Sequence, residues 1–344
     1  MSKIKMSNIN PYIVKSNINK NNAGKDKESD ARMKRGQINS EDLNPFKYFS
    51  YKKLVVMLSD DNSQNRTIAA ILLNKGTNVS IKNIKNIHEQ KYVINELSNS
   101  FKKEKALYCR IAMQDSLASF DELAVPYLIQ LLGKIGNNQE KELPKKYFNK
   151  KSFPLPRDLA ARALTNVGKP AITYLMDVLK DNVENFDDNN SNINYDDFVK
   201  EQAIDAIGAI AYKFNDHRAI NSLKNLFNIV RSNSNSSDSK IGNSNNKYYN
   251  NKNDIMMIWK IVRSLSGFKN DVNALNLVID ILNSYSEYYE IQWESVRSIG
   301  GIGIVNEDVK NTLNSIKTKL KNNSDDYGNS QVELSLKVAL NSMY

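Results

Sequence analysis

The chain has 344 residues, of which 40% are hydrophobic and 25% are charged, and its formal net charge is +10. It has no run of about 18 apolar residues, which argues against a membrane-spanning helix. The first residues lack the apolar core of a secretory signal, and the single cysteine, Cys109, excludes an intrachain disulfide. We therefore expect a cytoplasmic protein.

The positive charge has two explanations. It is compatible with an acidic partner such as nucleic acid, but an AT-rich genome also favours Lys, Asn and Ile, which abound in this chain. Beyond residue 124 the net charge alternates in sign between successive segments. This alternation differs from the single positive stripe expected of a helical repeat protein that binds nucleic acid.

Residues 1–44 are polar and rich in Asn, Lys and Ser, without sustained hydrophobic periodicity. We predict that this stretch is a disordered N-terminal tail. Order is expected to begin near Asn44, where Pro45, Phe46 and Phe49 follow.

From residue 45 to the C-terminus a pattern recurs: a helical stretch, a polar break, and a second helical stretch rich in Ala, Leu and Ile. Self-similarity at a period of roughly 40 residues indicates stacked helix pairs. We predict about seven pairs, with their helices at 45–76 (both helices), 87–101 and 105–120, 121–135 and 157–167, 170–180 and 198–214, 217–231 and 254–268, 272–284 and 289–302, and 307–321 and 330–343.

The second helix of the fourth pair shows why stacking is needed. Its apolar residues recur at helical spacing and form a broad stripe that one pair cannot bury alone. They are Val199, Ala203, Ala206, Ile207 and Ile210, with Ile204 and Ala211 widening the stripe.

Glycines mark the ends of several predicted helices. Gly76, Gly168 and Gly267 each follow a second helix, where a residue in the left-handed conformation is favoured.

Three long breaks separate the first helix of a pair from the second: 136–156, 181–197 and 232–253. In a stack of pairs these turns lie along one edge, so we expect the insertions to project side by side. The Ser- and Asn-rich break at 232–253 is predicted to be disordered.

Two copies share residue types at matching positions: Asp60, Arg66, Ala69, Ala70, Leu72 and Gly76, and again Arg157, Ala160, Ala161, Leu164 and Gly168. With these residues the copies resemble HEAT repeats of the short bacterial type, as in bilin-lyase-type HEAT proteins. The resemblance covers about 45–344 and implies an all-α, right-handed solenoid, usually a scaffold or adaptor and in a few cases an enzyme. We expect structural roles for two of the matched residues, with Asp60 capping a helix and Arg66 pairing with acidic or carbonyl groups at the adjoining turn.

Residues that could support catalysis have plainer interpretations. His88-Glu89 is a single His-Glu pair, too few for the two irons of HEAT-type hydroxylases. Trp259, Trp293 and Asp254 supply the residue types of HEAT-like DNA glycosylases, but the tryptophans lie among apolar residues at helical spacing and are predicted to be core. Cys109 is predicted to be a buried small side chain. We therefore predict no catalytic, cofactor-binding or metal-binding residues.

The strongest candidate contact surface is the break at 141–157, where basic and aromatic residues interleave. Such a segment can bind phosphates and stack on bases, can bind an acidic peptide, or can be a solvated loop packed on the solenoid edge. The candidate residues are Lys145, Lys146, Tyr147, Phe148, Lys150, Lys151 and Arg157.

The architecture favours a non-catalytic scaffold or adaptor that binds a protein or peptide. The alternatives are nucleic-acid binding through the basic units and segment 141–157, and an enzyme of the glycosylase or lyase type. The sequence does not determine the oligomeric state.

Overall fold

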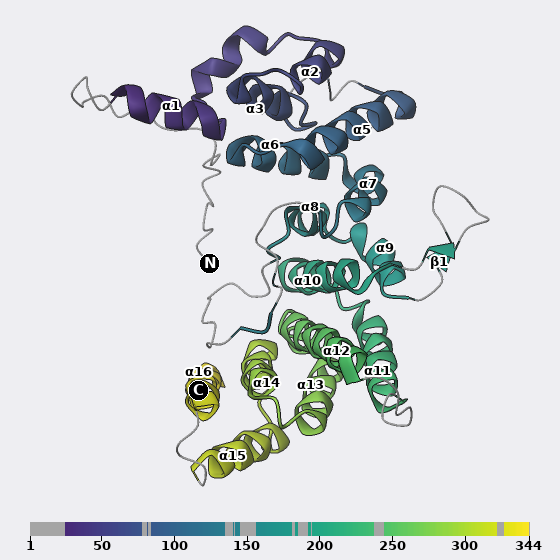
Figure 1. Cartoon of the computed structure of the whole chain (residues 1–344), viewed down its shortest axis with the longest axis vertical. Coiled ribbons are helices and arrows are strands. Elements are labelled where there is room, and N and C mark those ends of the chain that lie inside the picture. The colour runs from purple at the N-terminus through teal and green to yellow at the C-terminus, as the bar shows by residue number, and fades with distance from the viewer. Residues whose placement is uncertain are drawn as a thin grey trace, which may run out of the picture. The chain divides into compact units, whose positions relative to one another are not determined.

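The computed structural model describes residues 25–77, 81, 84–134, 140, 142–144, 156–180, 183–184, 192–193, 195–236, 244–321 and 327–343. The chain divides into two compact units, Met1–Ile135 and Gly136–Tyr344. Figure 1 shows helices in both units. The described residues are predominantly helical, as predicted, and their only strands form a short hairpin.

In the N-terminal unit α3 packs against α2 and α6, and α5 packs against α6. The predicted helices at 87–101 and 105–120 correspond closely to α5 and α6. The described elements are α1 (Lys25–Arg35), η2 (Ser40–Phe46), α2 (Tyr51–Met57), α3 (Ser63–Leu72), α5 (Ile87–Lys103), α6 (Leu107–Ala118), η3 (Asp121–Ala124) and α7 (Val125–Gln130).

The prediction of disorder is wrong for residues 25–44, which form α1 and the start of η2. Ile38 is fully buried, and α1 packs against α3. Gln64 Nε2 on α3 donates to the Gln37 carbonyl at 2.6 Å, and the Ser63 hydroxyl donates to that of Met33. A few contacts with α3 therefore order a stretch whose composition indicates disorder. Residues 1–24 of the predicted tail lie outside the described residues.

In the C-terminal unit α8, α10, α12, α14 and α16 pack in succession, and α9, α11, α13 and α15 each pack on one or two of them (Figure 1). We call the first set the second-helix layer. The elements are α8 (Leu159–Val167), α9 (Ala171–Val178), β1 (Val183–Glu184), β2 (Asn192–Ile193), α10 (Asp197–Phe214), α11 (Ile220–Ser236), α12 (Ser244–Leu265), α13 (Val272–Ser284), α14 (Tyr289–Ile302), α15 (Glu307–Lys321) and α16 (Tyr327–Met343).

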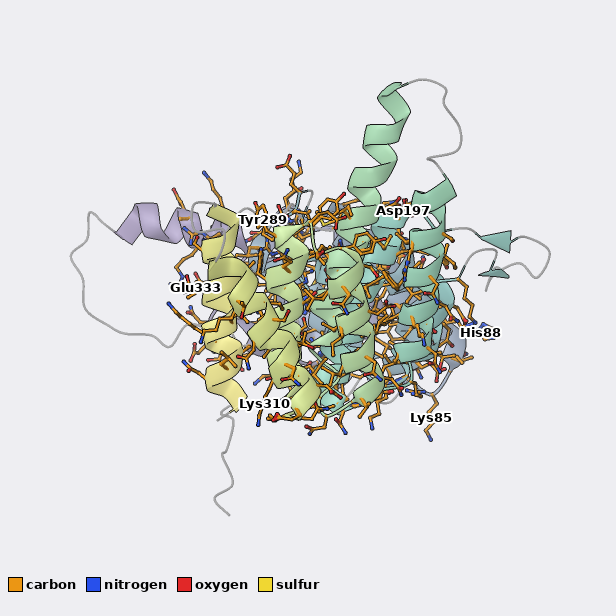
Figure 2. All side chains as sticks on the ribbon, turned by 90° about the horizontal axis from the view of Figure 1, so that it is seen from below. Lys85, His88, Asp197, Tyr289, Lys310 and Glu333 are labelled. Atoms are coloured by element: carbon orange, nitrogen blue, oxygen red, sulfur yellow. The ribbon has the colours of Figure 1, made fainter. Side chains whose placement is uncertain are left out.

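Two helices of the second-helix layer, α10 and α14, run in the same direction. Figure 2 labels Asp197 and Tyr289, their first residues, at the same end of the unit.

Small residues allow α10 and α12 to approach closely. A Cβ atom added to Gly267 would lie 2.2 Å from the carbonyl oxygen of Gly208, and one added to Gly208 would lie 2.7 Å from Ser264 Cα. Of the three glycines predicted to adopt the left-handed conformation, Gly168 has a positive φ of +81°, but its ψ of −136° lies outside that conformation. Gly76 and Gly267 do not have a positive φ, and at Gly267 the close approach explains the glycine instead.

Buried serines link neighbouring second helices in both units. Ser264 on α12 donates to the Ile204 carbonyl of α10 at 2.9 Å, and Ser298 on α14 donates to the Val262 carbonyl of α12 at 2.8 Å. In the N-terminal unit, Ser116 on α6 donates in the same way to the Ala70 carbonyl of α3. The same contact thus recurs along the chain.

Arginines in the first turn of three helices reach back to a preceding carbonyl. Arg66 donates to the Asp60 carbonyl at 2.7 Å, Arg110 to that of Glu104 at 2.5 Å, and Arg162 to that of Pro156 at 2.7 Å. The prediction that Arg66 pairs at the adjoining turn is confirmed. Its structural equivalent in α8 is Arg162, and not Arg157 as the sequence match indicated.

The helix-capping prediction for Asp60 is wrong, because the N-cap of α3 is Asn62, whose side chain accepts from the Gln64 amide at 2.9 Å. Asp60 instead accepts from the Asn62 amide at 2.8 Å. It supports the turn one step before the cap.

The predicted breaks differ in the structure. The break at 181–197 contains the antiparallel hairpin of β1 and β2, and most of 136–156 lies outside the described residues. The break at 232–253 is shorter than predicted, because α11 extends to Ser236 and α12 begins at Ser244. No Pro or Gly interrupts 244–253, so a polar helical extension is allowed there. None of the described helices has the length and apolarity needed to span a membrane.

Candidate functional site

The C-terminal unit buries four charged side chains in one cluster. Lys260 and Arg263 lie on α12, Asp205 lies on α10, and Glu140 comes from the non-helical stretch that precedes α8. All four are at most 8% exposed. We call these four residues the Glu140 cluster.

Two carboxylates and two cations are joined by direct contacts in this cluster. Lys260 Nζ lies 2.7 Å from Asp205 Oδ2 and 3.1 Å from Glu140 Oε2. Arg263 binds both oxygens of Glu140, with Nη1–Oε1 at 2.6 Å and Nη2–Oε2 at 3.1 Å. It also pairs with Asp205. Two-oxygen recognition of this kind is the strongest geometry that arginine offers a carboxylate.

The helices place these groups through simple spacing. Lys260 and Arg263 are three residues apart on α12 and therefore project from the same side of the helix. Arg263 also lies over the ring of Trp259, one turn earlier, at 4.4 Å from the ring centroid. This stacking helps to hold the guanidinium in place.

The cluster shifts the ionisation of its members. Burial alone would raise the pKa of Glu140, but the charges of Arg263 and Lys260 outweigh it and lower that pKa to about 2. Burial alone would lower the pKa of Arg263, yet Asp205 and Glu140 raise it above its usual value. All four groups are therefore interdependent, and loss of one leaves a buried charge uncompensated.

Two further carboxyl groups flank the cluster. Burial raises the pKa of Glu201 to about 8, against the opposing charge of Lys260. Burial also raises the pKa of Glu294 on α14, although Arg297 lies 3.3 Å away. Glu201 Oε2 has no hydrogen-bond partner among the described residues. The surroundings of the cluster thus disfavour further negative charge.

The structure places only one of the predicted contact residues. Arg157, which precedes α8, lies with its Nε 3.1 Å from Glu140 Oε1, so it binds an acidic group of its own chain. The remaining predicted residues lie outside the described residues; they are Lys145, Lys146, Tyr147, Phe148, Lys150 and Lys151.

The residues that were considered for catalysis lie in surroundings that indicate structural roles. Trp259 and Trp293 are buried, which confirms their predicted place in the core. Cys109 is buried as predicted, and burial raises the pKa of its thiol. His217 Nδ1 lies 2.7 Å from Asp271 Oδ2. In the described part of the chain, no group of three or more His, Cys, Asp or Glu side chains is placed to bind a metal ion.

Sequence reasoning missed the Glu140 cluster. Lys260 and Arg263 interrupt the apolar pattern of a helix that is otherwise core, and Asp205 interrupts that of α10. Charged residues within strongly apolar helices were the available signal, since such groups are rarely buried without partners. Their partner Glu140 lies 120 residues from Lys260, and no local pattern connects them.

The N-terminal unit carries an open depression of about 450 Å³ between η2 and α3, lined by Arg32, Asn39, Phe46, Gln64 and Asn65 among others. Arg32 Nη2 donates to Asn39 Oδ1 at 2.9 Å across it. It holds no cluster of buried charges comparable with the one around Glu140.

Comparison with known proteins gives no match: no protein-family model fits this chain, and no curated protein is similar to it.

Proposed function

We propose that this chain is a non-catalytic binding protein that holds an extended polypeptide against the second-helix layer of its C-terminal unit. The observation that carries the proposal is the way in which Glu140 is bound. A residue from a non-helical stretch is bound by side chains of two packed helices, through contacts of 2.6–3.1 Å to Lys260 and Arg263. A layer that binds the side chain of a residue from outside its helices in this way is suited to bind another.

The recurring contacts of the fold support the same proposal. The serine bonds between second helices and the arginine contacts at helix starts repeat along the chain. They support a HEAT-like, right-handed solenoid of about seven pairs, an architecture that offers long binding surfaces. Nucleic acid is the second candidate partner. No contact among the described residues supports it, because Arg157 is paired with Glu140.

Site-specific photo-cross-linking in cells tests the proposal. Tyr212 is 40% exposed and lies on α10 about two turns beyond Asp205, on the same side of the helix. Val272 is 59% exposed on α13, outside the second-helix layer, and serves as the matched control. A photo-reactive phenylalanine at Tyr212 should capture a discrete polypeptide that the same residue at Val272 does not. Equal capture at both positions, or nucleic acid in place of polypeptide, would contradict the proposal.

A further inference from the structure

We infer that Glu140 occupies, within its own chain, a recognition site for an acidic side chain of a partner polypeptide, and that the partner displaces it. The inference rests on the proposed function and specifies it in two respects. The partner segment is extended and carries a Glu or Asp side chain. The unliganded chain occupies its own site.

The charge balance of the helices requires an added anion. Lys260 and Arg263 contribute two positive charges, and Asp205 contributes one negative charge, all of them buried. The helix residues alone therefore leave one positive charge uncompensated in a place that water does not reach. Uncompensated buried charge is strongly unfavourable. Glu140 supplies the negative charge that compensates it, and it also pairs with the partly exposed Arg157.

The geometry favours a carboxylate over a phosphate. Arg263 binds the two oxygens of Glu140 side by side at 2.6 Å and 3.1 Å, which matches the planar fork of a carboxylate. Asp205 shares the same two cations and would repel a group that carries about two negative charges.

The anion belongs to the one member of the cluster that does not lie on a helix. Lys260, Arg263 and Asp205 project from packed helices, whereas Glu140 lies outside the helices. Of the described residues 140 and 142–144, Glu140 alone is buried. The cationic part of the site is thus built into the helices, and exchange requires that the contacts of Glu140 to Lys260, Arg263 and Arg157 break.

A peptide competition experiment on the full chain tests the inference. The probe is a fluorescent peptide with the sequence of residues 136–144, and the chain carries Glu140→Ala. We expect this variant to bind the peptide at least about 10-fold more tightly than the wild-type chain, because the tethered Glu140 competes at an effective concentration near millimolar. Glu142→Ala, which removes an exposed acid of the same stretch, should behave like wild type.

A second peptide carries Gln in place of Glu140 and should not bind. If it binds as well as the first, or if the first does not bind the Glu140→Ala chain, the inference is wrong. A partner captured at Tyr212 would still support the proposed function in that case. If peptide binding depends on the acid but no polypeptide is captured at Tyr212, the inference is supported and the proposed function is contradicted.

Thermal unfolding provides a second readout in case Glu140→Ala folds poorly. Propionate fits the space of the missing side chain and should raise the melting temperature of this variant by several degrees. Chloride or phosphate at equal ionic strength should not. The double variant Glu140→Ala/Lys260→Met restores the charge balance and should not respond to propionate. A response of that double variant equal to the single one, or no response of either, would overturn the inference.

Discussion

Glu201 lies beside the Glu140 cluster and is held in its neutral form near pH 7. Burial raises its pKa to about 8, and the charge of Asp205 adds to this effect while Lys260 opposes it. In the unfolded chain the same group ionises near its ordinary value of 4.5. Folding therefore takes up a proton at Glu201 over the pH range between these two values.

This difference predicts the effect of Glu201→Gln. Since the folded state binds more protons than the unfolded state at Glu201, the wild-type free energy of unfolding falls as pH rises from about 4.5 to about 8. The glutamine variant lacks this loss and should be more stable than wild type by about 1–3 kcal/mol at pH 8, with little difference at pH 4. Urea titrations at both pH values measure this, and an equal effect at both would contradict it.

Arg66 and Glu104 form an ion pair in the N-terminal unit, in which the Glu104 side chain is buried and the Arg66 side chain is 20% exposed. Arg66 Nε lies 2.7 Å from Glu104 Oε2, and Glu104 also accepts from the amides of Lys105 and Ala106, each at 2.8 Å. Burial alone would raise the pKa of Glu104. Several contacts outweigh burial, the largest being the hydrogen bond from Arg66, and they lower this pKa to about 2.

Glu104→Gln should therefore destabilise the N-terminal unit by about 2–4 kcal/mol at pH 7, because it leaves the Arg66 charge without its carboxylate partner. In wild type this stabilisation is complete above pH 4.5 and is lost as pH falls through about 2. The difference between variant and wild type should accordingly shrink toward pH 2. Glu96→Gln, at a half-buried position on α5, is the control, and denaturation monitored by circular dichroism gives the values.

At the scale of elements, the contact between α10 and α12 depends on glycines, which have no side chain. Gly208 and Gly267 bring the two backbones together, and the Ser264 hydroxyl bonds across the contact to the Ile204 carbonyl. This approach sets the position of α12, and with it the distance between Lys260 and Asp205. The packing of small residues and the charged cluster are thus parts of one helix contact.

Gly267→Ala tests this dependence, since the added Cβ would lie 2.2 Å from the Gly208 carbonyl oxygen. The helices must separate, and we expect a loss of about 2–4 kcal/mol in unfolding free energy. Gly76→Ala is the control: its Cβ would meet only the tip of Asn74 at 3.1 Å, and its cost should stay below about 1 kcal/mol. Chemical denaturation compares them, and similar costs would show that the close approach is not required.

At the scale of the molecule, the chain consists of two compact units with separate cores. Ile38 and the Arg66 pair stabilise the first, and the Glu140 cluster and the glycine contact of α10 and α12 stabilise the second. In helical repeat proteins each repeat is stabilised mainly by its immediate neighbours. Destabilisation should therefore remain within the unit that carries the change.

Hydrogen exchange measured by mass spectrometry tests this division. Gly267→Ala should speed exchange in helices α10, α12 and α14 and leave α3, α5 and α6 unchanged. Ile38→Ala should instead speed exchange in α3, α5 and α6 and leave α10, α12 and α14 unchanged. It should lower the unfolding free energy of the N-terminal unit by about 2–4 kcal/mol. Faster exchange throughout the chain from either substitution would indicate one cooperative unit.

Where local signals are strong, the sequence predicted the helices closely. The predicted ranges 272–284 and 289–302 are the bounds of α13 and α14, because Asp271 caps the first and Gly303 ends the second in the left-handed conformation. Where the helix is polar, as at the start of α12, the hydrophobic period vanishes and the prediction began ten residues late, at Asp254 instead of Ser244.

By itself, the sequence determined the helical class of the chain, the positions of most helices and the burial of Cys109, Trp259 and Trp293. These follow from periodicity and composition within short windows. Only the tertiary structure decided that residues 25–44 are ordered, that Gly267 serves a close approach, and that Glu140 meets Lys260 and Arg263. Each of these depends on atoms brought together from distant parts of the chain, and for Glu140 and Arg263 the separation is 123 residues.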